Sequence, residues 1–157
     1  EKVAYLTWLY KKVWPRLLSW VEQSNTPSTI HNYVYTNGKN QPQEILQAIR
    51  EGHSFISNGP LVTAEVNGAS YGEKAVLKDN TGKLSVHVFS KKPINHLWMY
   101  TGADKKVELC AKADTAEGGF TYDIAADEFD FGDTAWALFV ADGGENNLAI
   151  SNPILFA

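Results

Sequence analysis

The feature that most constrains the fold is a change in the spacing of apolar residues at Gly52. Before it, residues 2–22 and 41–51 carry apolar side chains three and four positions apart, which is typical of helices. After it, apolar and polar residues alternate in short segments, with turn signals about every 8–12 residues. No helical spacing follows residue 52. This pattern predicts short antiparallel strands in two stacked sheets.

We therefore predict an α+β fold that is mainly β, with N-terminal helices beside an antiparallel β-sandwich. The predicted boundary separates a helical segment, residues 1–52, from a sandwich domain, residues 53–157. The predicted core consists of Leu61, Val66, Leu84, Val86, Val88, Leu97, Met99, Val107, Leu109, Trp136, Leu138, Val140, Ile150 and Ile154.

The first 22 residues form an apolar stripe that Pro15 interrupts, which predicts two short helices or one kinked helix. The stripe consists of Leu6, Leu9, Tyr10, Val13, Leu17, Trp20 and Val21. Trp8 and Trp14 widen this apolar surface. Three packing partners remain open for this apolar surface: the chain's own sheets, a missing domain, or a second copy of the chain.

Two local signals mark the ends of predicted elements. Asn40 and Gln43 form a capping pair, and Gly52 is a natural stop, so residues 41–51 are expected to be helical. Further on, Asn67-Gly68 is a strong hairpin signal.

Charge and cysteine content exclude several classes of function. The 157 residues have a net charge of −4, and residues 113–157 hold nine acidic residues and no Lys or Arg. Neither nucleic acid nor a membrane surface is therefore an expected partner. A single cysteine, Cys110, excludes an internal disulfide and a cysteine-rich zinc site.

The sequence shows no catalytic or metal-binding constellation. Its four histidines lack the spacings of metal ligands; we expect His87 to be exposed and His96 to cap a turn. The acidic segment from Asp123 to Asp133 is predicted to be a solvated loop, with a weak calcium site as the alternative. No serine has the Asp and His neighbours that would activate it as a nucleophile.

The stretch over residues 31–73 is HNYVYTNGKNQPQEILQAIREGHSFISNGPLVTAEVNGASYGE. It resembles the C-terminal region of metal-dependent hydrolases of the polymerase-and-histidinol-phosphatase (PHP) family, in the CehA/McbA-like branch. There, a segment of the form G-x-x-F-[VI]-x-N-G-P ends the catalytic barrel and leads into a β-sandwich that begins V-N-G-x-x-x-G. Residues 52–60, Asn67-Gly68 and Gly72 match these patterns, and residues 149–154 resemble the last strand of the family.

The resemblance implies a C-terminal accessory domain of a phosphoesterase-class hydrolase. Its partner would be the missing N-terminal catalytic domain, where divalent metals activate water. The S-D-x-H motif expected before the tyrosine strand falls on residues 24–28, which contain neither Asp nor His. No metal ligand or catalytic residue therefore transfers to this chain. The metals are expected in the parent enzyme, and this chain alone is expected to be non-catalytic.

Three residues within the matched stretch are candidates for lining the substrate cleft of the parent enzyme. His31 and His53 stand where the family pattern has arginine, and Asn58 belongs to the N-G-P segment. We predict a binding role for these three residues and no catalytic role.

Two other interpretations remain open. One is a free-standing β-sandwich that binds carbohydrate or protein, because Trp98 and Tyr100 alternate along one strand and their rings could stack on sugars. The other is a structural domain that forms homo-oligomers through residues 2–22.

Overall fold

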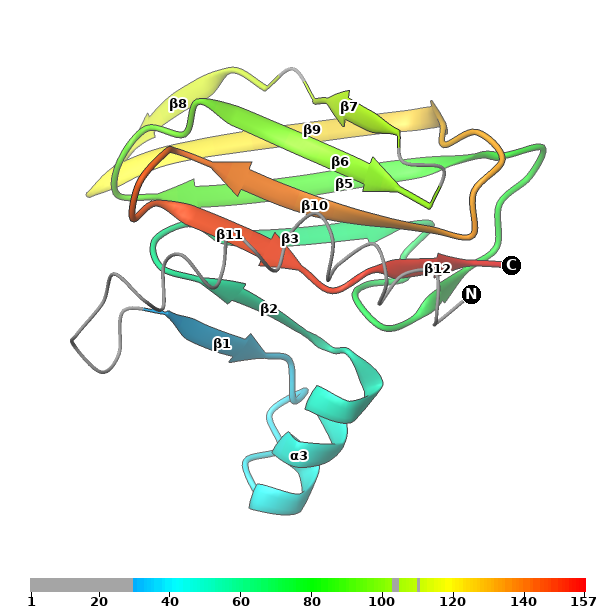
Figure 1. Ribbon diagram of the computed structural model, residues 1–157, viewed down its shortest axis with the longest axis horizontal. Coiled ribbons are helices and arrows are strands. Elements are labelled where there is room, and N and C mark those ends of the chain that lie inside the picture. The colour runs from blue at the N-terminus through cyan, green and yellow to red at the C-terminus, as the bar shows by residue number, and fades with distance from the viewer. Residues whose placement is uncertain (1–29, 103–104, 110) are drawn as a thin grey trace.

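The computed structural model in Figure 1 describes residues 30–102, 105–109 and 111–157 of the chain. The predictions for residues 1–22 and for Cys110 lie outside the described residues. The described chain is mainly β, with antiparallel sheets and one helix, which confirms the predicted α+β, mainly β class. The elements are β1 (His31–Val34), α3 (Pro42–Glu51), β2 (Ser54–Ser57), β3 (Leu61–Val66), β4 (Lys74–Ala75), β5 (Thr81–Ser90), β6 (His96–Thr101), β7 (Lys106–Glu108), β8 (Ala113–Ala116), β9 (Gly119–Asp130), β10 (Trp136–Asp142), β11 (Leu148–Ser151) and β12 (Ile154–Phe156).

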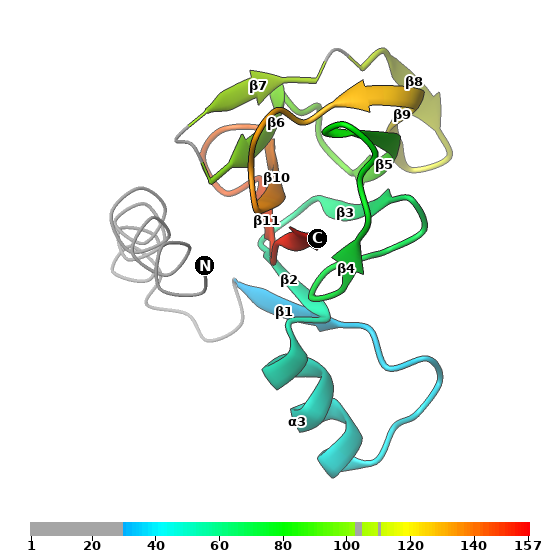
Figure 2. The ribbon, with the colours of Figure 1, turned by 90° about the vertical axis from the view of Figure 1, so that its right-hand side faces the viewer.

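The strands form a larger and a smaller sheet. In the larger sheet, β1, β2, β11 and β10 follow one another, and β6 and β7 continue beyond β10. β11 and β12 pair with successive parts of β10, and β12 then pairs with β4 in the only parallel pairing among the described strands. The smaller sheet has the order β3, β5, β9, β8. Figure 2 shows β6, β10 and β11 on one side and β3, β5 and β9 on the other.

One apolar cluster draws on both sheets. Val66 of β3 and Val88 of β5 meet Met99 of β6 and Phe139 of β10, and none of the four side chains is exposed. Alternate residues of a strand point to opposite faces, and in β3 and β5 every second side chain is buried in this core. The two sheets therefore share one hydrophobic core.

Most of the predicted core is buried, and the exception has a simple cause. Leu61 is 38% exposed, whereas Val62, Ala64 and Val66 of the same strand are buried. Leu61 and Val66 are five positions apart, so a strand cannot place both on one face. The prediction that Leu61 lies in the core is wrong. Val107 is only half-buried, because it lies on the short strand β7.

One of two local predictions needs correction. The helix is capped one position later than expected: the Glu44 carboxylate accepts a hydrogen bond from the Gln41 backbone N–H at 3.3 Å. Asn67-Gly68 does turn the chain, with φ angles of 50° and 80°. Val66 and Ala69 pair across this turn as an antiparallel bridge, with two backbone hydrogen bonds of 2.9 Å, so a hairpin turn forms as predicted. The pairing goes no further, because β3 pairs with β5 while β4 joins the larger sheet.

Residues 31–51, here called the arm, comprise the edge strand β1 of the larger sheet, the connection that follows it, and α3. β1 pairs with β2 alone among the described strands and forms an edge of the larger sheet, so that sheet extends across the predicted boundary at residue 52. The helix α3 projects away from both sheets (Figures 1 and 2). None of the described helices has the length and apolar character that a membrane span requires.

Candidate functional site

The arm joins the sheets at a close contact between two glycines. Gly52 ends α3 with a left-handed φ of 83°, and the His53 N–H donates to the Ala48 carbonyl oxygen at 2.9 Å. Gly72 lies against this helix end: a Cβ on Gly72 would stand 2.1 Å from the Glu51 carbonyl oxygen. The backbones can approach this closely only because Gly72 lacks a side chain, while Gly52 is favoured by its left-handed φ.

Asn152 and Pro153, from the C-terminal end of the chain, complete the junction. The Asn152 side-chain amide donates to the carbonyl oxygen of Ser54 at 3.0 Å and to its hydroxyl at 2.9 Å. The Gly72 N–H donates to the Pro153 carbonyl oxygen at 2.9 Å. The end of α3, the Gly72 turn and residues 152–153 therefore meet at one place.

The Ser57-Asn58-Gly59-Pro60 turn is held by a second set of contacts. The Asn58 side-chain oxygen accepts a hydrogen bond from the Leu148 N–H at 2.7 Å, and the Asn58 N–H donates to the Leu148 carbonyl oxygen at 3.1 Å. A Cβ on Gly59 would lie 2.5 Å from the Asn147 side-chain oxygen. This turn fastens β2 to the start of β11.

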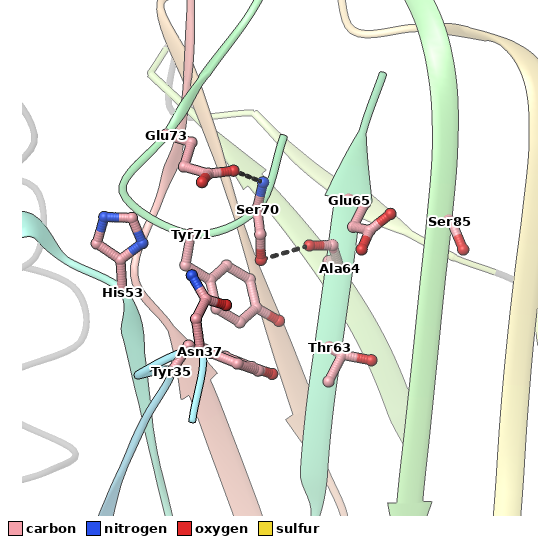
Figure 3. Close-up of a pocket in the computed structure, with 10 residues that line it drawn as sticks. All are labelled: Tyr35, Asn37, His53, Thr63, Ala64, Glu65, Ser70, Tyr71, Glu73 and Ser85. Atoms are coloured by element: carbon pink, nitrogen blue, oxygen red, sulfur yellow. Dashed lines mark hydrogen bonds between the residues drawn. The ribbon is translucent and has the colours of Figure 1, made fainter. Parts of the chain in front are cut away.

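A cavity of about 410 Å³ lies between the arm and β3 (Figure 3). Its lining consists of Tyr35, Asn37, His53, Thr63, Ala64, Glu65, Ser70, Tyr71, Glu73 and Ser85. Some polar groups of the lining are hydrogen-bonded to one another. The Glu73 carboxylate accepts a hydrogen bond from the Ser70 N–H at 2.7 Å, and the Ser70 hydroxyl donates one to the Ala64 carbonyl oxygen at 3.3 Å.

The two tyrosines of this cavity have raised pKa values. Burial is the main cause of the raised pKa of Tyr35, and the negative charge of Glu65 adds to it. Burial also raises the pKa of Tyr71 well above its ordinary value, and the Tyr71 hydroxyl donates to the Val62 carbonyl oxygen at 3.1 Å. Both phenols therefore stay protonated at neutral pH, where they offer hydrogen bonds and do not act as bases.

A second cavity of about 310 Å³ runs along α3 and shares Tyr35, Asn37 and His53 with the first. His53 lines both cavities, and its Nε2 lies 3.4 Å from the Glu51 carboxylate. The predicted cleft candidate His53 is thus placed where the arm, its helix and the sheets meet.

The other two cleft candidates lie elsewhere on the β1–β2 pair. His31 is exposed and stands opposite Ser57, so His31 and Asn58 share one end of the pair. His53 precedes β2 at the opposite end, about four residues or ~13 Å away along an extended strand. The structure brings His31 and Asn58 to one end and does not bring His53 to them; a binding role for the three residues stays a prediction.

The acidic segment is a strand where a loop was expected. Residues 119–130 form β9, and the acidic side chains of this strand, Asp123, Asp127, Glu128 and Asp130, are all exposed. The His87 ring nitrogen lies 2.6 Å from the Asp123 carboxylate, and Lys83 lies 3.3 Å from Asp127. The loop prediction is wrong because the segment pairs along its length with β5. Within the described part of the chain, no three His, Cys, Asp or Glu side chains are grouped so that they could hold a metal ion.

Trp98 is engaged by neighbours on its own face of the larger sheet. The His96 ring stacks on it with centroids 4.9 Å apart, and the Lys106 ammonium lies 3.5 Å from its centroid. His96 also pairs with Glu108 at 2.6 Å and begins β6, so it does not cap a turn as predicted. A sugar that stacked on Trp98 would have to displace these contacts.

The arm carries most of the exposed large apolar side chains of the described residues. Tyr33, Leu46 and Ile49 are 37%, 54% and 40% exposed, and Tyr35 is exposed to a similar degree. The apolar spacing of Ile45, Leu46 and Ile49 predicts one helix face, and these residues were not among the predicted core. Only Ala48 of α3 is buried. The exposure of this face is the feature that the sequence analysis did not predict.

Comparisons with known proteins add no relative to this description. No protein-family model matches the chain, and neither a curated protein nor a solved structure is significantly similar to it.

Proposed function

We propose that this chain is a non-catalytic accessory domain of a larger metal-dependent hydrolase, of the PHP-like phosphoesterase class, and that it docks on the catalytic domain through its arm. The observation that carries the proposal is the exposed apolar face of α3, formed by Leu46 and Ile49. The class of the partner rests on the resemblance over residues 31–157.

An apolar face on a short helix needs a partner. The ten residues of α3 are fewer than an isolated helix in water requires, and most helical stability in proteins comes from packing of the apolar face. In α3 only Ala48 is buried, while Leu46 is more than half exposed. A docked protein that covers Leu46 and Ile49 would supply the missing packing.

The junction makes the arm suitable for docking. The Gly52–Gly72 contact and the Asn152 hydrogen bonds to Ser54 tie the end of α3 to both β2 and the C-terminal segment. A surface held in one orientation loses less conformational entropy on binding than a mobile one. The segments that resemble the family are close-packed at this position, and on this proposal their packing serves to hold the arm in one orientation.

The proposal also assigns the two cavities beside the arm to the substrate cleft of the parent enzyme. His53, Tyr35 and Asn37 line both cavities beside the arm. A catalytic domain seated on α3 would lie next to them, so that this chain would form one wall of the cleft and His53 would face the partner.

The test pairs two substitutions of exposed apolar residues. Leu46→Asp places a charge on the proposed docking face, and Val76→Asp does the same at a site that is 71% exposed and lies off the arm. The polypeptide encoded upstream of Glu1 in the same reading frame is produced separately, and its affinity for this chain is measured by titration calorimetry. We expect Leu46→Asp to weaken binding by about tenfold or more, or ~1.4 kcal/mol, and Val76→Asp to leave it unchanged.

Two results would contradict the proposal. One is an upstream reading frame that encodes no His- and Asp-rich catalytic domain. The other is equal binding by the Leu46→Asp and Val76→Asp variants. In the same experiments the isolated chain should show no metal-dependent hydrolysis of a generic phosphodiester, whereas the reunited parts should show it.

A further inference from the structure

The sequence contains three Asn-Gly pairs, and the structure holds them in different ways. Asn37-Gly38 lies in the connection between β1 and α3, Asn58-Gly59 follows β2, and Asn67-Gly68 follows β3. In such a pair the backbone nitrogen of the glycine can attack the side-chain amide of the asparagine, because glycine has no side chain to shield that nitrogen. The surrounding contacts decide whether each pair can reach the geometry of attack.

The Asn58-Gly59 pair is held at both reacting groups. The Asn58 side-chain oxygen accepts a hydrogen bond from the Leu148 N–H at 2.7 Å. The Gly59 N–H, which carries the attacking nitrogen, donates to the Ser57 hydroxyl at 2.9 Å. Both hydrogen bonds must break before the nitrogen can approach the amide carbon.

The Asn67-Gly68 pair is held through its side chain and its turn. The Asn67 side-chain nitrogen donates to the Val76 carbonyl oxygen at 2.7 Å, and its side-chain oxygen accepts from the Lys83 N–H at 2.7 Å. Across the turn, Val66 and Ala69 exchange two backbone hydrogen bonds of 2.9 Å. The amide group of Asn67 is therefore fixed by both of its ends.

The Asn37-Gly38 pair has the same backbone and lacks these contacts. Its φ angles are 50° and 80°, the values of the Asn67-Gly68 turn, and the Lys39 N–H closes the turn on the Thr36 carbonyl oxygen at 3.0 Å. The Asn37 side chain is exposed and has no hydrogen-bond partner among the residues that the structure describes. A Cβ on Gly38 would meet no atom within 4 Å, so nothing obstructs closure of a ring between the two residues.

We propose that Asn37 is a site of spontaneous deamidation in the folded chain, and that the fold protects Asn58 and Asn67. The Gly38 nitrogen gives its proton to solvent and bonds to the side-chain carbonyl carbon of Asn37. The bond from that carbon to the side-chain nitrogen breaks, and ammonia leaves with a proton from solvent. Water then adds to the resulting succinimide and breaks one of its two ring C–N bonds, which gives aspartate or isoaspartate. Water is the only co-reactant.

The product changes the charge of both cavities beside the arm, because Asn37 lines each of them. The larger cavity, drawn in Figure 3, already has Glu65 and Glu73 in its described lining and neither Lys nor Arg. A carboxylate at position 37 adds negative charge near His53, which the two cavities share. An effect of this charge on a substrate cleft rests on the proposed function, whereas the modification itself does not.

The experiment is peptide mapping by mass spectrometry of the full chain, kept at physiological temperature and mildly alkaline pH. At each of the three asparagines it follows the replacement of the side-chain NH2 by OH and the appearance of isoaspartate. Each hydrogen bond that must open first slows the reaction by roughly two- to tenfold. We therefore expect Asn37 to react at least about tenfold faster than Asn58 or Asn67 in the folded chain.

Two controls separate the fold from the local sequence. In urea that unfolds the chain, the three asparagines should react at similar rates. Asn37→Gln should remove the fast reaction, because the longer side chain must close a larger ring.

Equal rates at Asn37 and Asn67 in the folded chain would overturn the proposal. An advantage of Asn37 that persists unchanged in urea would overturn it too, because the local sequence would then be the cause. The measurement needs no catalytic domain, so a failure of docking through the arm leaves this proposal standing, and its own failure leaves docking untouched.

Discussion

Replacing Gly72 with alanine tests whether the junction holds the arm in place. Gly72 has a φ of +80°, a conformation that costs an L-residue with a Cβ about 1–2 kcal/mol. Its added Cβ would also stand 2.1 Å from the Glu51 carbonyl oxygen and 2.9 Å from the carbonyl carbon of Gly52. Both neighbours are backbone atoms, so neither can rotate away as a flexible side chain would.

Gly68 provides the matched control. It has the same φ of +80°, but a Cβ there would meet no atom within 4 Å. Gly68→Ala should therefore lower the free energy of unfolding only by the cost of the left-handed backbone conformation, about 1–2 kcal/mol. Gly72→Ala should cost an additional ~1–3 kcal/mol of overpacking, for a total loss of about 2–5 kcal/mol in the free energy of unfolding.

The assay is urea unfolding of both variants and the unchanged chain, followed by circular dichroism. A typical domain has about 5–15 kcal/mol of stability, so both variants should still fold and give measurable midpoints. Equal losses of stability in Gly72→Ala and Gly68→Ala would refute the reasoning, because the contact with the end of α3 would then contribute nothing. In the binding experiment, Gly72→Ala should also weaken docking through the arm, since the Glu51 carbonyl must retreat.

The remaining predictions concern the core and the buried phenols. Leu84→Ala, at a side chain that is 0% exposed, should lower the free energy of unfolding by about 2–5 kcal/mol. Leu61→Ala, at an exposed side chain, should lower it by less than about 1 kcal/mol; equal losses in urea unfolding would contradict the strand register. The pKa of Tyr71 is raised in the folded state, so the stability that depends on its neutral form is complete below about pH 10 and is lost as the pH rises towards the folded-state pKa. Unfolding measured over a pH series should show a shallower alkaline decline in Tyr71→Phe than in the unchanged chain, and identical slopes would count against a buried, protonated phenol.

The sequence was a sound guide to strand β5 and to the one described helix. The alternation in residues 84–88 predicted a strand with Leu84, Val86 and Val88 on the buried face, and all three are buried. The helix over residues 42–51 was also predictable, because its apolar spacing and its terminal Gly52 lie within one short segment. Periodicity reports which residues share a face of one element, and that relation does not depend on the rest of the fold.

The errors concern partners that are distant in the sequence. The Asn67-Gly68 turn has the geometry of a hairpin turn, but β4 joins β12 instead of β3, a choice that the local turn does not determine. The acidic segment became β9 because β5 offers it a pairing edge along its length. Local composition cannot reveal such an edge, since two strands far apart in the sequence must first be brought together.

The candidate site likewise combines features that the sequence revealed with features that only the fold creates. His53 and the N-G-P segment were visible as a motif, but the larger of the two cavities that share His53 exists only because the arm lies near β3. Leu46 and Ile49 were recognisable as one helix face, whereas their exposure was not, because exposure depends on which surface stands opposite the helix.

By itself, then, the sequence determined the one described helix, strands such as β5 and their alternation of faces, since these follow from the conformational preferences of neighbouring residues. Only the tertiary structure decided that Gly52, Gly72 and Asn152 meet and that the apolar face of α3 stays uncovered. The physical reason is that backbone contact and burial are relations between surfaces from distant segments, and they arise only when the two sheets and the arm are assembled.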